Sequence, residues 1–189
     1  MTDSTAIKKT IINFVGFQIG WFACVLGGAN AMPWLGPLLA IPILAWHFSQ
    51  ARDWTRELRL IAIIAIAGSL FDQFLLWLDW IQYPSSNWPG WLLPVWMPTL
   101  WVMFSSTLNV SLRWMRGKYW IGLVFGMIGG PLAYIAGQKL GAMELASQTN
   151  ALIVLAVGWA MMMPAMLWLS SIFDGYVNAA SNKGELSHV

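Results

Sequence analysis

The sequence predicts an all-α membrane protein, a bundle of six transmembrane helices with both the N-terminus and the C-terminus in the cytoplasm. Three observations predict this class. Hydrophobic residues make up 58% of the 189-residue chain and charged residues only 10%, whereas a soluble domain carries roughly 25% charged residues. Six apolar segments divide the chain, and its lysines and arginines collect in alternate links between them.

The six apolar segments are long enough, or nearly so, for a membrane crossing, which takes ~20 residues. The second contains Pro37 and Pro42, and we expect it to be kinked or partly unwound because proline removes a backbone donor. The segments form one domain over residues 1–173, and the polar, aperiodic residues 174–189 predict a disordered cytoplasmic tail. The predicted helices cover about residues 11–29, 33–48, 60–80, 91–112, 118–138 and 151–173.

The distribution of basic residues predicts the orientation, because lysine and arginine stay preferentially on the cytoplasmic side. Nine of the ten lysines and arginines lie in the terminal segments and alternate links that six crossings place in the cytoplasm, and only Lys139 lies on the other side. A rival interpretation is a signal peptide cleaved near the Ala-Asn-Ala tripeptide at residues 29–31. The apolar run is longer than the ~7–15 residues of a signal peptide and carries Asn13 and Gln18. We therefore expect a multi-pass protein of the bacterial inner (cytoplasmic) membrane.

The outer link at residues 81–90, together with the helix ends beside it, is rich in aromatic residues and proline and has no basic residue. Tryptophan and tyrosine favour the membrane–water boundary, so this region predicts an aromatic belt. A lid or a lipid-contact surface is the alternative. The residues are Trp77, Trp80, Tyr83, Trp88, Trp91 and Trp96, with Pro84, Pro89 and Pro94.

Small residues recur at four-residue spacing in two of the predicted helices. Helices in lipid associate by close packing, and small side chains permit it. Both runs therefore predict faces that contact neighbouring helices. They are Gly16, Gly20, Cys24 and Gly28 in the first helix and Gly122, Gly126 and Gly130 in the fifth.

Asp72 is the leading candidate for a functional residue, because it lies near the middle of the predicted third helix. A carboxylate at that depth costs about 2.5–3.5 kcal/mol on insertion scales, so it should face protein or water. Asp79 follows two turns later on the same face, and the two predict a polar track to the outer surface. A proton or cation path would have this form. A structural carboxylate followed by an ordinary interfacial aspartate would have it too.

Other polar side chains fall between the cytoplasmic boundary and Asp72 when depth is counted at ~1.5 Å per residue. We expect a polar vestibule, open to the cytoplasm, that leads to Asp72 and its neighbour Gln73. The same arithmetic places His47 about 15 Å from Asp72, too far for a direct catalytic pair. The alternative is a set of unrelated side chains that reach water at helix ends. The candidate lining residues are Asn13, Gln18, Ser105, Ser106 and Asn109.

Familiar catalytic and cofactor motifs are missing from the sequence. The chain has two histidines and one cysteine, with no His-Glu-x-x-His, no Gly-x-Ser-x-Gly and no phosphate-binding glycine loop. We therefore expect no metal and no cofactor, and the absence of a basic patch with interleaved aromatics predicts no nucleic-acid partner. The expected partners are membrane lipids and, as a further option, another membrane protein. Candidate contacts for anionic headgroups are Arg52, Arg56, Arg113 and Arg116.

Three segments resemble a family of small proteobacterial inner-membrane proteins known only as a domain of unknown function. They are NFVGFQIGWF at residues 13–22, LWVMFSSTLNVSLRW at residues 100–114 and GGPLAYIAG at residues 129–137. The resemblance extends over roughly residues 13–168. It implies a compact multi-helix bundle and no established activity.

Three functional hypotheses remain open from the sequence. The first is a non-enzymatic helper or small transporter for a lipid-like or apolar molecule, with Asp72 as a proton or ligand contact. The second is a membrane-embedded enzyme that acts on lipid, with Asp72 as acid or base and the cytoplasmic arginines holding a headgroup. The third is a structural subunit of a membrane complex.

Overall fold

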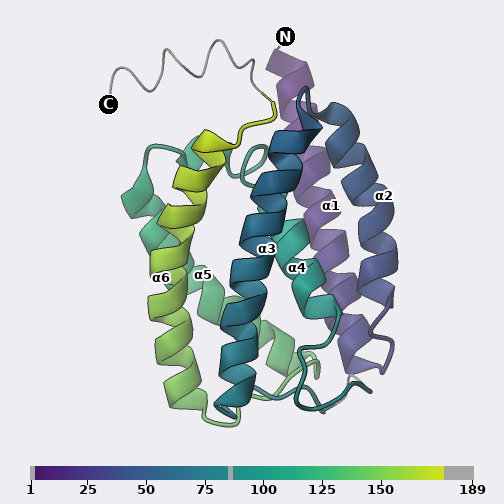
Figure 1. Cartoon of the computed structure of the whole chain (residues 1–189), viewed down its shortest axis with the longest axis vertical. Coiled ribbons are helices and arrows are strands. Elements are labelled where there is room, and N and C mark those ends of the chain that lie inside the picture. The colour runs from purple at the N-terminus through teal and green to yellow at the C-terminus, as the bar shows by residue number, and fades with distance from the viewer. Residues whose placement is uncertain (1–2, 85–86, 177–189) are drawn as a thin grey trace.

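The computed structural model describes residues 3–84 and 87–176. Over these ranges the chain folds into six α-helices and no β-strand, which confirms the all-α class. A short 3-10 turn, η2 (Arg113–Met115), lies between the fourth and fifth helices. The helices are α1 (Asp3–Ala29), α2 (Leu35–Gln50), α3 (Trp54–Trp77), α4 (Trp96–Ser105), α5 (Tyr119–Lys139) and α6 (Gln148–Ile172) (Figure 1).

Four of these helices, α1, α3, α5 and α6, are long and apolar enough to cross a membrane. The other two, α2 and α4, have 16 and 10 residues, fewer than the ~20 that a full crossing takes. Large apolar side chains stand on the outer helix faces, among them Ile66, which is 63% exposed, and Met161, which is 66% exposed. Extended apolar surfaces of this kind are rare on soluble monomers. The helices therefore indicate a membrane protein.

The third helix begins six residues before its predicted start and ends three residues before its predicted end. Asp53 explains the early start, because its carboxylate accepts hydrogen bonds from the backbone N–H groups of Thr55 and Arg56. An aspartate in this position satisfies donors that the first helical turn leaves open. The arginines of the predicted link, Arg56 and Arg59, consequently belong to the helix.

The second helix is continuous from Leu35 to Gln50, so the predicted partial unwinding at its prolines is wrong. Pro37 lies in the first turn, where the backbone N–H has no intrahelical partner in any case. Pro42 lies inside the helix, where the missing donor interrupts one backbone hydrogen bond without ending the helix.

The predicted fourth helix is broken. After α4 the chain passes through tight turns over residues 106–112 before it reaches η2. Asn13 of α1 bonds this irregular backbone, because its side chain donates to the Ser106 carbonyl and accepts from the Ser111 N–H. Irregular backbone at membrane depth is tolerated where protein surrounds it, and Ser106, Asn109 and Ser111 are all buried.

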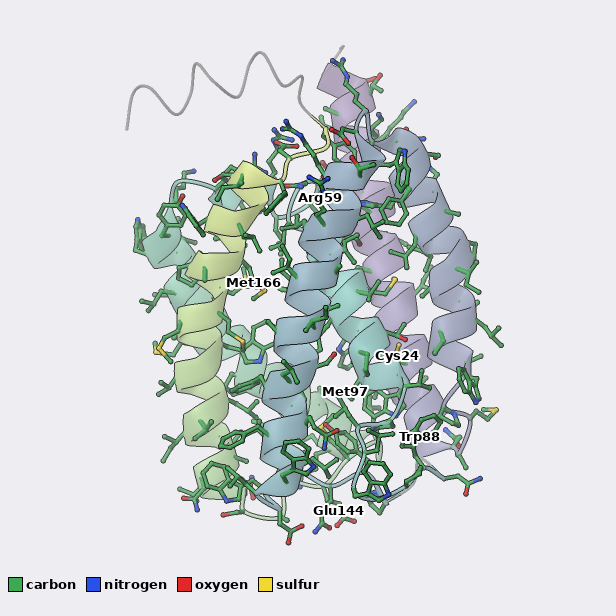
Figure 2. The ribbon with its side chains drawn as sticks, viewed as in Figure 1. Cys24, Arg59, Trp88, Met97, Glu144 and Met166 are labelled. Atoms are coloured by element: carbon green, nitrogen blue, oxygen red, sulfur yellow. The ribbon has the colours of Figure 1, made fainter. Side chains whose placement is uncertain are left out.

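The helices form two packed groups. α1 packs against α2 and α4, and α3 packs against α4, whereas α5 packs mainly against α6. The start of α1, the start of α3 and the ends of α2 and α6 lie together at one end of the bundle (Figure 1). We call this the basic end, since it carries Arg59 in Figure 2, and we call the opposite end, where Glu144 lies, the aromatic end.

Glycines make the contact between α5 and α6 close, as the sequence predicted for the fifth helix. Gly122, Gly126 and Gly130 are buried on one face of α5. A Cβ atom at Gly126 or Gly130 would collide with Trp159 of α6, and one at Gly122 would collide with Leu167. The small-residue face therefore positions Trp159 against α5.

The aromatic link does not form a single belt. Trp77 and Trp91 are each 69% exposed, as a belt requires, but Trp96 is fully buried in the core. Tyr83 packs edge-to-face on Trp96, with ring centroids 5.6 Å apart. Part of the link is therefore core and part is surface.

Candidate functional site

A cavity of about 290 Å³ lies between the two packed groups of helices. Residues of α1, α4, α5 and α6, with Met143 from the loop after α5, line it, and none of them is charged. Ligand sites are typically concave and mostly apolar, with a few polar groups that fix orientation. The lining residues are Phe17, Gln18, Trp21, Val25, Met97, Leu100, Trp101, Phe104, Phe125, Gly129, Gly130, Ala133, Tyr134, Met143 and Trp159.

Stacked aromatic rings form one wall of the cavity. The rings of Trp101 on α4 and Trp159 on α6 stack with centroids 4.9 Å apart and planes 14° from parallel. Phe104 packs edge-on against Trp159, with centroids 5.3 Å apart. On the α5 side, Gly130 lets the Trp159 ring lie directly against the helix, and Gly129 leaves open space beside it.

Asp72 lies behind this cavity as part of a buried polar cluster. Its side chain is fully buried. The Trp101 indole N–H donates to Asp72 Oδ2 over 2.6 Å, and the Tyr134 hydroxyl donates to Oδ1. A buried carboxyl needs hydrogen-bond donors because it has lost its hydration. Asp72 does not itself line the cavity, but both of its donors do.

The polar track from Asp72 to Asp79 does not form. α3 ends at Trp77, so Asp72 lies five residues before the helix end rather than near its middle. Asp79 lies in the following turn with φ 59°, and it accepts a hydrogen bond from Gln82 over 2.6 Å. The two carboxylates therefore do not share a helix face.

Gln73, adjacent to Asp72, anchors the aromatic link and does not face the cavity. Its amide donates to the Trp91 carbonyl over 3.0 Å and accepts from the Leu93 N–H over 2.9 Å. Gln18 lines the apolar cavity, which is a different feature from the expected polar vestibule. The Ser105 hydroxyl donates a hydrogen bond to the Trp101 carbonyl, one turn earlier in the same helix.

A second buried cluster occupies the basic end, with Glu57 at its centre. Glu57 is fully buried and accepts from Asn109 Nδ2 over 2.6 Å and from the Gly175 N–H over 2.7 Å. Its other oxygen lies 3.1 Å from His47 Nε2. Sequence reasoning missed Glu57, because only the basic residues of that link were used. The available signal was an acidic residue placed between Arg56 and Arg59, at the edge of an apolar helix.

Arginines complete this cluster by binding Asp174, which follows α6. Arg113 and Arg116 reach the same oxygen of Asp174 over 2.6 Å and 2.7 Å. Arg116 also donates to the Asn109 side chain and to the Ser170 carbonyl. Asp174 is only 1% exposed, whereas Arg113 is 38% and Arg116 17% exposed, so the carboxylate is buried beneath two arginines that reach the surface.

The first residues of the predicted tail are packed onto the bundle. Gly175 fits so closely that a Cβ atom would collide with Glu57 and the Asp53 carbonyl. The Tyr176 hydroxyl donates to the His47 carbonyl over 2.9 Å. Burial and the nearby carboxylates of Glu57 and Asp174 raise the pKa of Tyr176 above its ordinary value. The rest of the predicted tail, residues 177–189, lies outside the described residues.

The expected vestibule is therefore a closed network at the basic end. Asn13, Ser106, Asn109 and His47 are all buried. They are hydrogen-bonded within two neighbouring sets, one around Asn13 and one around Glu57. In the structure these side chains bond Glu57 and the backbone.

The four candidate headgroup arginines have contacts within the protein. Arg113 and Arg116 bind Asp174, and Arg56 Nε lies 3.3 Å from Asp53. The Arg52 backbone N–H donates to the Gly175 carbonyl over 2.8 Å. The Thr55 hydroxyl, which donates to Asp53, lowers the pKa of that carboxyl below its ordinary value. Binding of anionic lipid headgroups stays a prediction for these four arginines.

Replacing Glu57→Leu keeps most of the side-chain volume but removes the acceptor of the cluster. We expect a loss of about 3–5 kcal/mol in the free energy of unfolding, the usual cost of removing one partner from a buried charged pair. Denaturant titration in mixed micelles measures it. The matched control is Glu144→Leu at the exposed aromatic end, expected to change stability by at most about 0.5 kcal/mol. Equal stability of the two variants would show that the cluster does not hold the bundle together.

Comparison with known proteins supports the resemblance noted in the sequence. No curated protein and no solved structure matches the chain. Residues 10–165, which include every residue that lines the cavity, match the family described as "Protein of unknown function (DUF2878)". The chain therefore belongs to the DUF2878 family.

Proposed function

We propose that this chain is a multi-pass inner-membrane protein that binds a lipid-like or apolar molecule within the bilayer, as a non-enzymatic helper or small transporter. The observation that carries the proposal is the uncharged, mostly apolar cavity between α1, α4, α5 and α6, in which seven of the fifteen lining residues are aromatic. A cavity at this depth is reached from lipid rather than from water. Its apolar walls match the part of a lipid that has no charge.

The exposure of several lining residues supports entry from the membrane. α1 is held by α2 and α4, and α5 is held by α6. Phe125, which lines the cavity from α5, is 42% exposed. Phe17 and Gln18 line it from α1 and are only partly buried. A ligand would pass between α1 and α5.

The position of Asp72 favours binding over an acid–base role. Both of its carboxylate oxygens accept hydrogen bonds from side chains that stand between it and the cavity. A ligand would contact Trp101 and Tyr134 first. Asp72 would therefore orient these two rings, acting as a positioning residue.

The proposal also includes the orientation of the helix bundle in the membrane. We infer six crossings with the basic end in the cytoplasm, in which α2 and the broken segment from α4 to η2 serve as the two short crossings. The segregation of basic residues supports this orientation. The common placement of the start of α1 and the end of α6 supports an even number of crossings (Figure 1).

Filling the cavity tests the binding proposal. Ala133→Trp places a large ring in the cavity, whereas Leu132→Trp places the same ring on a surface that is 57% exposed. We expect a lipid-like molecule to co-purify with the wild-type protein and with Leu132→Trp but to be depleted at least several-fold from Ala133→Trp. Mass spectrometry of the extracted lipids measures this. Equal recovery from all three folded proteins would contradict binding in this cavity.

Cysteine labelling tests the orientation. Ser49→Cys reports on an exposed position at the basic end, and Gly90→Cys on an open position at the aromatic end. The native Cys24 is fully buried, so it should contribute little background. In spheroplasts, a membrane-impermeant maleimide should label Gly90→Cys at once and Ser49→Cys only after permeabilisation. The opposite labelling pattern would mean that the basic end faces the periplasm. Equal labelling of both variants before permeabilisation would contradict the proposal that the two ends lie on opposite sides of the membrane.

A further inference from the structure

The residues that follow Phe173, residues 174–176, cross from the end of α6 toward α3 at the basic end (Figure 1), and we call them the strap. The strap is neither helix nor strand, so contacts with other segments hold it in place. The Asp174 carboxylate is buried, and its Oδ2 accepts from Arg113 over 2.6 Å and from Arg116 over 2.7 Å. Two guanidinium groups therefore bind an anion that the chain itself supplies.

The next residue of the strap, Gly175, adds an N–H donor and a carbonyl acceptor. Its N–H donates to Oε1 of the buried Glu57 over 2.7 Å. Its carbonyl accepts from the backbone N–H groups of Arg52 and Asp53, over 2.8 Å and 3.0 Å. A Cβ atom at this position would collide with the Asp53 carbonyl oxygen and with Glu57. The strap thus places an anion on two arginines and, beside it, an N–H donor on a buried carboxylate.

The strap does not satisfy every donor of the arginine pair. Both guanidinium groups converge on one oxygen of Asp174, while the other oxygen accepts the Tyr176 N–H over 2.9 Å. Arg116 Nε is buried and has no hydrogen-bond partner among the described residues, which is unfavourable for a buried donor. A phosphate has more acceptor oxygens than a carboxylate, and arginine binds phosphate through two parallel hydrogen bonds. The arginine pair would therefore suit a phosphate better than it suits an aspartate.

The strap also resembles phosphoethanolamine in the spacing of its two groups. The Asp174 carboxylate oxygen and the Gly175 nitrogen are separated by the same number of covalent bonds as a phosphate oxygen and the amine nitrogen of phosphoethanolamine. In both, the nitrogen donates hydrogen bonds. An ammonium group in the place of the Gly175 N–H would give Glu57 a charge-assisted hydrogen bond. The partners of the strap therefore match a zwitterionic headgroup with a primary amine.

We propose that the basic end binds the headgroup of a phospholipid that carries a phosphate and a primary amine, as in phosphatidylethanolamine, and that the strap occupies this site when the lipid is absent. Arg113 and Arg116 bind the phosphate, and Glu57 accepts from the ammonium group. The backbone N–H groups of Arg52 and Asp53, released by the strap, are further donors to the headgroup oxygens.

The location of the site fits a membrane lipid. Basic pockets at the end of a helix bundle lie at the depth of lipid headgroups. Arg113 is 38% exposed, so a headgroup reaches the arginine pair as the strap leaves. None of the residues of this site lines the cavity, and the proposal therefore does not depend on a ligand in the cavity.

The test displaces the strap and compares three lipids that have the same acyl chains. They are phosphatidylethanolamine, phosphatidylcholine, whose amine has no N–H, and phosphatidylglycerol, which has no amine. The variant Gly175→Val forces the strap away because its side chain collides with Asp53 and Glu57. Gly90→Val is the matched control, since a Cβ atom there meets nothing within 4 Å. Native mass spectrometry of the full-length protein in detergent measures lipid binding.

We expect Gly175→Val to bind phosphatidylethanolamine about tenfold more tightly than the wild type, because the closed strap lowers the fraction of protein that is competent to bind. Binding of the other two lipids should rise by less than about threefold on the same basis. The control Gly90→Val should bind all three lipids like the wild type. The preference should persist in Ala133→Trp combined with Gly175→Val, because the cavity is a separate site. An equal rise for all three lipids, or no rise, would overturn the proposal.

Charge variants in the Gly175→Val background assign the two halves of the headgroup. Arg113→Gln should weaken phosphatidylethanolamine and phosphatidylglycerol alike, by about tenfold, because both carry the phosphate. Glu57→Gln should remove the preference for phosphatidylethanolamine, because an amide does not attract an ammonium group as a carboxylate does. Lys118→Gln, at an exposed lysine before α5, is the control and should change neither affinity. A preference that survives Glu57→Gln would overturn the assignment of the amine site.

A second variant and a soluble competitor complete the test. Asp174→Asn keeps the size of the side chain and removes the charge that the arginines bind, so it should raise phosphatidylethanolamine binding even if Gly175→Val does not fold. Glycerophosphoethanolamine, the same headgroup without acyl chains, should compete only weakly with the lipid. Full competition at equal concentration would assign the site to a soluble phosphate ester and overturn the lipid as ligand. Unchanged lipid binding in the folded strap variants would overturn the site itself.

Discussion

The structure depends on one constraint: inside a hydrocarbon layer, every buried polar group must find its partner within the protein. The broken segment after α4 shows the constraint acting on the backbone, where Asn13 binds both a carbonyl and an N–H of the turn. Gln73 does the same for the link before α4. Asp72 shows it acting on a side chain, whose two oxygens take donors from two other helices.

These requirements place two polar clusters on either side of the cavity. Near the aromatic end, Asp72 joins α3 to α4 through Trp101 and to α5 through Tyr134. At the basic end, the Glu57 cluster joins α2, α3 and the segments that flank η2 and follow α6. Between the clusters the two helix groups are separated by the aromatic cavity. Pinning both ends lets the middle stay open without loss of the fold.

The structural features that could be predicted from the sequence are those that depend on a local pattern of residues. Long apolar runs predicted the helices, and the glycine spacing predicted the α5 face that contacts α6. The sequence drew attention to Asp72, because a carboxyl in an apolar helix must be buried against protein or exposed to water, and the structure buries it against protein. Its donors, Trp101 and Tyr134, lie on two other helices, so no local pattern connected them to it.

The basic-end cluster could not be predicted for the same reason. Asp174 pairs with Arg113 across 61 positions in the chain, and its local surroundings resemble a polar tail. Glu57 lies among arginines, in a segment whose charges already had a topological explanation. The sequence did not indicate the break after α4, because the segment is apolar enough for a helix. The irregular backbone is stabilised by hydrogen bonds from Asn13, which lies far away in the sequence. Long-range pairing decides these features, and a single sequence does not display it.

The most direct measurement is a density map of the protein reconstituted in native lipid. We expect an elongated non-protein density between α1 and α5, in contact with Trp159 and Tyr134 and continuous with the surrounding lipid. Contact between α1 and α5 that closes the cavity, or a cavity filled by the protein's own side chains, would contradict it.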